Sequence, residues 1–182
     1  MAKTVHVVEK VLIPQGVEVK VDRLKVTVKG PKGQLTKDFS HARGIIIRKT
    51  DNEVIVETFF ADRKRKALIP TIASHIENMI IGVTKGFRYK LKIVFSHFPI
   101  SVKVSGDKVI IENFLGEKAP RIAKIVEGAK VKVMKDDIIV EGIDIEVVGQ
   151  TAANIERATR IKGYDRRVFL DGIYIYERGV IE

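Results

Sequence analysis

The sequence contains no cysteine among its 182 residues. Disulfides, thiolate metal sites and cysteine nucleophiles are therefore excluded, and the absence fits a reducing compartment. No uninterrupted apolar run approaches the roughly eighteen residues needed to span a bilayer. The N-terminal stretch MAKTVHVVEKVLIP also lacks the continuous apolar segment of a signal peptide. Together these absences predict a soluble, cytoplasmic protein.

Patterns that carry catalysis or bind metal are equally scarce. The four histidines occur singly, with no ligand spacing between them: His6, His41, His75 and His97. No P-loop, GxSxG or GxGxxG lies between a strand pattern and a helix pattern. Asp136 and Asp137 occupy a predicted hairpin turn, where carboxylates are common. We therefore expect no enzyme, no metal site, no cofactor and no small-molecule substrate.

What the chain has in excess is positive charge. Lys and Arg number 33 against 23 Asp and Glu, which gives a net charge of +10. Nucleic acid or another polyanion is therefore the leading class of partner. An anionic membrane is the rival polyanion, but the sequence shows no Lys-rich amphipathic helix with a bulky aromatic face. The apolar share of 45% is ample for a folded core.

Hydrophobic periodicity in the first half predicts strands followed by one helix. Residues 5–29 are expected to form strands, because apolar and polar residues alternate at residues 17–21 and 26–28, and the sequence GPKG at residues 30–33 predicts a turn. Two further strands are expected at residues 45–48 and 54–59. Asp62 is a suitable N-cap for a helix over residues 63–81. Pro70 interrupts that helix and predicts either a bend or two abutting segments.

The second half repeats this order. It opens with a strand at residues 86–95, whose odd-numbered residues, Phe95 included, are expected in the core. Three later segments match earlier ones at offsets of 83, 84 and 79: residues 108–113 with 25–30, 137–141 with 53–57, and 151–156 with 72–77. A shared order at near-constant spacing indicates duplication. We therefore predict an α+β fold of two tandem domains, residues 1–85 and 86–182, each an antiparallel sheet unit closed by one helix.

Three basic features compete as the contact surface. Four cations open the first helix, where they oppose its macrodipole: Arg63, Lys64, Arg65 and Lys66. We name them the helix-start cations. A second feature is the ladder Arg88, Lys90 and Lys92 on one face of the strand at residues 86–95. Each of these two features is read either as a solvated face or as a binding surface.

The third feature is a loop that follows the second helix. Residues 157–167 carry one acid, Asp165, against five cations, which we name the loop cluster: Arg157, Arg160, Lys162, Arg166 and Arg167. Tyr164 and Phe169 lie among them, and a short strand is expected at residues 173–176. Residues 1–98 have a net charge of +10 and residues 99–182 a net charge of zero. A local cluster still attracts phosphate, because charge within about 10 Å dominates at moderate salt.

Several motifs resemble a known family. Residues 148–155 read VGQTAANI, residues 167–175 read RVFLDGIYI, and residues 87–92 read FRYKLK ahead of SHFP at residues 96–99. With these motifs the chain resembles the ribosomal large-subunit protein six family, in its archaeal and eukaryotic form. The similarity covers essentially the whole chain. Pro70 departs from the small or flexible residue usual at that place.

The resemblance implies a structural protein of the large ribosomal subunit. Such a protein binds large-subunit ribosomal RNA near the stalk base and the sarcin–ricin loop, beside neighbouring ribosomal proteins. Carried over to this sequence, the RNA-binding residues are Gly149, Gln150, Arg157, Arg160, Lys162, Tyr164, Arg166 and Arg167. A phosphate at the start of the second helix would suit Gly149 and Gln150. The helix-start cations form a secondary basic patch.

The resemblance and the charge pattern together predict roles along residues 157–178. The first eleven residues would bind RNA, with Asp165 and Asp171 orienting the arginines. The remainder would anchor the loop, with four apolar side chains docked into the core: Phe169, Leu170, Ile173 and Ile175. Two alternatives use the same patch: a free RNA- or DNA-binding regulator, and a basic protein–protein adaptor.

Overall fold

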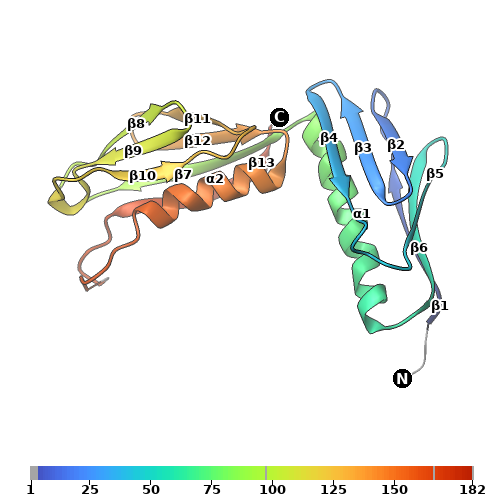
Figure 1. Cartoon of the computed structure of the whole chain (residues 1–182). Coiled ribbons are helices and arrows are strands. Elements are labelled where there is room, and N and C mark those ends of the chain that lie inside the picture. The colour runs from blue at the N-terminus through green and yellow to red at the C-terminus, as the bar shows by residue number, and fades with distance from the viewer. Residues whose placement is uncertain (1–3, 97, 166, 182) are drawn as a thin grey trace. The chain divides into compact units, whose positions relative to one another are not determined.

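The computed structural model describes residues 4–96, 98–165 and 167–181. The chain divides into two compact units, Met1–Lys85 and Gly86–Glu182 (Figure 1). Within the described residues, each unit contains six strands followed by one α-helix in the same order, and the second unit adds one further strand. All strand pairs are antiparallel. The predicted fold class is confirmed.

The first unit forms two three-stranded sheets covered by one helix. Its strands join in the orders β2-β3-β4 and β1-β6-β5. The helix α1 packs on β1, β3 and β6. The bounds are β1 Thr4–Leu12, β2 Glu18–Asp22, β3 Lys25–Gly30, β4 Gly33–Asp38, β5 Ile46–Lys49, β6 Glu53–Ala61 and α1 Arg63–Thr84.

The second unit repeats this plan with a larger sheet. Its strands join in the orders β8-β9-β10 and β11-β12-β7-β13, and α2 packs on β10, β12, β13 and β7. The bounds are β7 Phe87–Val94, β8 Ser101–Ser105, β9 Lys108–Glu112, the short 3₁₀ helix η1 Phe114–Gly116, β10 Arg121–Lys124, β11 Lys130–Val133, β12 Asp137–Gly142, α2 Ile145–Ala158 and β13 Gly172–Val180.

The duplication extends to strand register. In the first unit Ile46 pairs with Glu57, and in the second Lys130 pairs with Glu141, each position shifted by 84 residues. Glu57 accepts a hydrogen bond from Arg48. Glu141 accepts one from Lys132, the residue 84 positions after Arg48, at 3.3 Å. The two halves therefore share an ion pair as well as a chain trace.

The strand β13 has no counterpart in the first unit. It pairs with β7 along nearly its whole length, from Gly172 opposite Val94 to Val180 opposite Phe87. The strand of the first unit that is equivalent to β7 is β1, and β1 lies at the edge of its sheet. The strand predicted at residues 173–176 is thus nine residues long and completes a four-stranded sheet.

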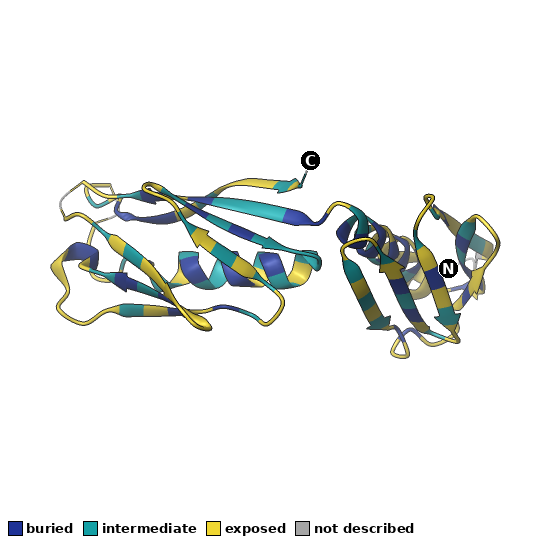
Figure 2. Cartoon of the chain, turned by 90° about the horizontal axis from the view of Figure 1, so that it is seen from above, coloured by how far each residue is buried: buried dark blue, intermediate teal, exposed yellow. Residues whose placement is uncertain are grey.

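The helix α1 forms because its ends are capped and one face is apolar. The Asp62 carboxylate accepts the N–H of Arg65 at 2.8 Å, as predicted. Its buried side chains recur at helical spacing and lie in the core of the unit: Ile69, Ile72, Ile76, Met79, Ile80 and Val83. Figure 2 shows the same recurrence of buried positions along α2. A Cβ on Gly30 would lie 2.7 Å from the Val83 side chain, so glycine is required there.

By length and mean hydropathy, α1 alone among the described helices could cross a membrane. Its apolar face is instead covered by β1, β3 and β6, which is typical of the core helix of a folded domain. Buried and exposed positions alternate along α1 at helical spacing, which is typical of an amphipathic rather than a uniformly apolar helix.

The prediction that Pro70 could divide this helix into two abutting segments is wrong. The helix runs without interruption over 22 residues, past Pro70 and on to Thr84. Proline removes a single N–H, the one that would bond to the carbonyl of Lys66. Because Lys66 and Pro70 are both exposed, water can satisfy that carbonyl and the helix continues.

Replacing Pro70 with alanine is expected to raise the free energy of unfolding by about 1–3 kcal/mol, because alanine restores the missing helical hydrogen bond. Thermal unfolding followed by circular dichroism would measure the gain. Replacing exposed Ala67, one turn earlier, with serine is a suitable control, with a loss of a few tenths of a kcal/mol at most. A lower melting temperature for Pro70→Ala would show that the ring itself is required.

One core prediction on β7 is also wrong. Phe87, Leu91 and Ile93 are buried as expected, but Phe95 is 45% exposed. The strand ends at Val94, so its alternation no longer governs Phe95. The neighbouring His97 lies outside the described residues.

Candidate nucleic-acid interface

The ladder on β7 is neutralised by acids of neighbouring strands. Arg88 bonds to Glu141 at 2.7 Å, Lys90 to Glu177 at 2.9 Å, and Lys92 pairs with Asp137 at 3.4 Å. Asp137 itself lies in β12 rather than in the predicted turn. The hydrogen bond from Lys90 to Glu177 raises the pKa of the lysine. Burial alone would raise the pKa of Glu141, but Arg88 and Lys132 together lower it. The ladder is a set of internal ion pairs.

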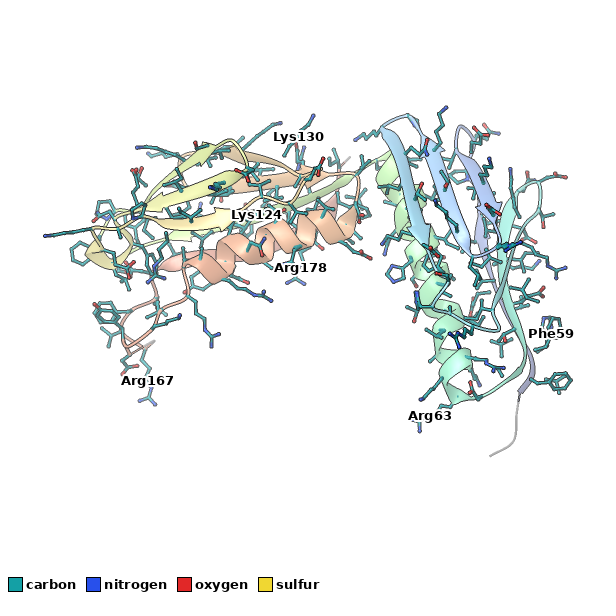
Figure 3. The ribbon with its side chains drawn as sticks, in the orientation of Figure 1. Phe59, Arg63, Lys124, Lys130, Arg167 and Arg178 are labelled. Carbon is teal, nitrogen blue, oxygen red and sulfur yellow. The ribbon has the colours of Figure 1, made fainter. Side chains whose placement is uncertain are left out.

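The loop cluster is different. Its described members are exposed, and none of them forms an ion pair within residues 4–96, 98–165 and 167–181: Arg157, Arg160, Lys162 and Arg167. Figure 3 shows the Arg167 side chain projecting from the loop beyond the end of α2. Arg166 lies outside the described residues. Cations without acidic partners are free to meet phosphate.

Arg121, on β10, holds the beginning of this loop. Its Nη1 donates to the carbonyls of Ala158 and Arg160, each at 3.0 Å, and so caps the C-terminus of α2. Nε and Nη2 donate to Glu117 at 2.8 and 2.6 Å, and the hydrogen bond from Arg121 lowers the pKa of that carboxyl. The guanidinium also lies 4.2 Å from the ring centre of Phe114. Sequence reasoning missed Arg121, because its partners are up to 39 residues away.

Two shallow hollows flank Arg157 and Arg160. One, of about 330 Å³, is lined by these two arginines with Arg121 and Lys162. The other, of about 350 Å³, is lined by the same two arginines with Glu156, Thr159, Ile161 and Tyr174. The first suits a phosphate group, because its polar lining is cationic. The second combines a charged rim with an aromatic ring and suits a sugar or base edge.

The far end of the loop is tied to α2 through backbone groups. Thr159 Oγ1 accepts the N–H of Ile173 at 2.9 Å and donates to the carbonyl of Glu156 at 3.1 Å. Glu156 Oε1 accepts the N–H of Ile175 at 3.2 Å. The two ends of residues 160–171 are therefore joined side by side, which limits the freedom of the loop between them.

The motif at residues 167–172 serves the fold of this loop. Asp171 is fully buried and accepts the N–H of Ser96 at 3.2 Å, which ties the loop to the segment after β7. Gly172 lies against the ring of Tyr174, where an added Cβ would come within 2.8 Å. Asp165 accepts the backbone N–H of Arg167 at 2.9 Å and so orients that residue.

The apolar residues of the loop follow the predicted roles only in part. Ile173 is fully buried, whereas Leu170 is 58% exposed, so the predicted docking of Leu170 is wrong. Phe169 is half-buried, and its ring centre lies 4.8 Å from that of Tyr164 at an angle of 55°. The half-exposed Tyr164 thus has one aromatic neighbour and an open side beside the cations.

Comparison with known proteins identifies this two-unit architecture. The family described as Ribosomal protein L6 matches residues 13–86 and again residues 98–172, one match in each unit. The chain belongs to the ribosomal protein L6 family. The second match ends at Gly172, the first residue of β13.

Archaeal relatives of this L6-family chain match over its full length. It is 64% identical over 181 residues to large ribosomal subunit protein uL6 of Aeropyrum pernix and 65% identical over 185 residues to that of Ignicoccus hospitalis, with 100% of both chains covered. The protein of the same name from Desulfurococcus amylolyticus is 66% identical over 181 residues, 98% of each chain. The predictions of a cytoplasmic ribosomal protein with a structural rather than enzymatic role are confirmed.

Gly149 and Gln150 were expected to bind phosphate because they would lie at the start of the second helix. That placement is wrong in this L6-family chain. The helix α2 begins at Ile145, so both residues lie in its second turn, where N–H groups bond within the helix. The first turn is already capped, because the Asp144 carboxylate accepts the N–H of Glu146 at 2.9 Å. Gln150 donates instead to Asn154 at 2.8 Å. The start of α2 is acidic and capped, and Gly149 and Gln150 do not lie there.

The helix-start cations are exposed at the beginning of α1. No acid lies in the first turn of this helix, and none of the four forms an ion pair within the part of the chain that the structure describes. Arg65 lies beside Gly44, where an added Cβ would be 3.3 Å from the guanidinium carbon. Within the described residues, the helix-start cations therefore resemble the loop cluster, because both lack the acidic partners that neutralise the ladder on β7.

Proposed function

We propose that the chain is a constituent of the large ribosomal subunit that binds large-subunit ribosomal RNA through the loop cluster. The single observation that carries the proposal is the sorting of cations by partner: the β7 ladder is paired with acids, whereas the described cations at residues 157–167 are unpaired and flank two hollows. The names of the archaeal relatives support the same subunit.

The contact works through phosphate positions and RNA shape rather than base sequence. Arginine presents a planar fork that donates to two phosphate oxygens at once, so Arg157, Arg160 and Arg167 suit a folded backbone. Side chains cannot read the deep, narrow major groove of A-form RNA, which leaves backbone and 2′-hydroxyl contacts. Gln150, exposed on α2, and the open side of Tyr164 extend this surface.

The loop is held in place before RNA arrives. Arg121 fixes its beginning, and Thr159 with Glu156 fixes its end. A surface ordered in the free protein loses less conformational entropy on binding than a disordered loop would. As the family resemblance implies, the RNA in question lies near the stalk base and the sarcin–ricin loop, beside neighbouring ribosomal proteins.

Crosslinking on intact large subunits tests this proposal. The tagged chain should sediment with large subunits in moderate salt, and its RNA crosslinks should concentrate in the peptides that cover residues 157–167. A chain that stays free in lysate, or that selects short duplexes by sequence, would instead be a regulator. Crosslinks confined to other segments of the second unit would reject the loop cluster as the contact.

A further inference from the structure

Two aromatic side chains project from the end of β6 in the first unit. Phe59 is 46% exposed and the adjacent Phe60 is 63% exposed. The His6 ring stacks on Phe59, with ring centres 4.5 Å apart and planes within 3° of parallel. Figure 3 shows Phe59 pointing away from the sheet. The fold therefore exposes part of these rings to solvent, where they contribute little to the packing of the core.

Phe60 also has an unfavourable backbone conformation. Its φ of 50° lies in the left-handed region, which a bulky side chain avoids. Burial does not offset this cost, since most of the ring is exposed. A strained, exposed aromatic residue inside a strand is a feature that occurs at functional sites.

Positive charge follows these rings closely in the chain, since Arg63 comes three residues after Phe60. Two residues after Phe60 comes Asp62, the N-cap of α1, and the helix-start cations follow it. Two of the N–H groups at the helix start already have acceptors, because the Asp62 carboxylate accepts from Arg65 and the Asp62 carbonyl accepts from Lys66. The exposed side chains of the helix-start cations are the charged groups available here. Four cations at the positive end of a helix repel its dipole, and an anionic partner would remove that repulsion.

We propose that Phe59 and Phe60, with the helix-start cations, form a second RNA-binding surface that takes unpaired nucleotides. Bases stack on the exposed rings, and the cations contact the phosphates on either side of them. Aromatic rings beside cations are the arrangement that binds single-stranded nucleic acid, because every base has a face to stack. The proposal goes beyond the loop cluster: it uses the first unit and an unstacked strand rather than folded RNA.

The charge favours RNA over a protein partner. Lysine is depleted at protein interfaces, whereas two lysines stand among the four helix-start cations that follow the rings, and none of the four forms an ion pair within the described chain. A polyanion with stackable bases satisfies the rings and the cations together.

A binding assay with full-length protein tests this surface. The chain has no tryptophan, so 2-aminopurine fluorescence in a single-stranded RNA decamer reports base stacking without interference. The protein would carry glutamines at Arg157, Arg160 and Arg167, which keeps the loop cluster from masking the signal. Phe60→Gly in that background should weaken decamer binding about tenfold. It should also raise the melting temperature, since glycine accepts the left-handed conformation.

The control variants separate stacking from other contacts. Phe60→Leu should weaken binding as Phe60→Gly does, because leucine is apolar but cannot stack. Phe95→Ala removes an exposed ring of the second unit, 45% exposed against 46% for Phe59, and should leave decamer affinity unchanged. Affinity for a fully paired duplex of equal length should not respond to Phe60→Gly.

Three results would overturn the proposal. Decamer affinity that is negligible, or that is the same with and without Phe60, would show that the rings do not stack on bases. Full retention of affinity in Phe60→Leu would indicate a plain apolar contact. Loss of assembly into large subunits when Phe60→Gly is made in the chain with its loop cluster intact, together with unchanged decamer binding, would assign the rings to a protein partner. None of these results bears on the loop cluster, whose own test uses folded RNA.

Discussion

Replacing Arg157, Arg160 and Arg167 together with glutamine is expected to weaken binding to a folded large-subunit RNA fragment about 100-fold at low salt. Each removed charge-assisted contact contributes about 1 kcal/mol or more. Each neutralised phosphate also releases counterions, so the slope of log affinity against log salt should flatten by about three units at most. Filter binding or fluorescence anisotropy over a series of salt concentrations would measure both quantities.

A matched variant separates local contact from net charge. Replacing Lys90, Lys92 and Lys103 with glutamine removes the same formal charge, but each of these lysines is paired with an acid of a neighbouring strand. We expect this variant to retain affinity within a few-fold. Equal losses in the two triple variants would mean that net charge alone attracts RNA. An affinity that barely changes with salt in the unmodified protein would favour the adaptor alternative.

Replacing Thr159 with valine is expected to lower the free energy of unfolding of the second unit by about 1–3 kcal/mol. Valine has nearly the shape of threonine, so packing is kept while the hydroxyl is lost. The N–H of Ile173 would then lack its acceptor in a site where Thr159 is 3% exposed. Because this bond joins α2 to β13, RNA affinity should fall as well, as the loop becomes less ordered. Denaturant unfolding and anisotropy would follow the two effects.

Thr159→Ser provides the control for this prediction. Serine keeps the hydroxyl that accepts from Ile173 and donates to Glu156, and it loses a single methyl group. Its stability should stay within about 1 kcal/mol of the original, with RNA affinity unchanged. If serine and valine destabilise equally, the methyl group and its packing matter rather than the hydrogen bond. If valine destabilises but RNA affinity is unaffected, the anchor does not order the binding loop.

Features that depend on neighbouring residues could be predicted from the sequence. Alternation identified β2 and β3, the GPKG turn joins β3 to β4, and Asp62 and Asp144 cap the two helices as local chemistry requires. The duplication was visible because each repeat carries the same local pattern in the same order. The excess of Lys and Arg, and its concentration at residues 157–167, are likewise properties of the sequence alone.

Tertiary structure alone decided which of these cations are available. Lys90 pairs with Glu177, which lies 87 residues away, and Arg121 reaches the end of α2 from β10. Pairing at such separations depends on strand register, since register determines which side chains lie next to each other. Phe60 is a further example, because no local sequence pattern predicted its left-handed backbone or its exposed ring. The sequence by itself therefore determined the fold and its charge, and the folded sheets determined which charges remain free for phosphate.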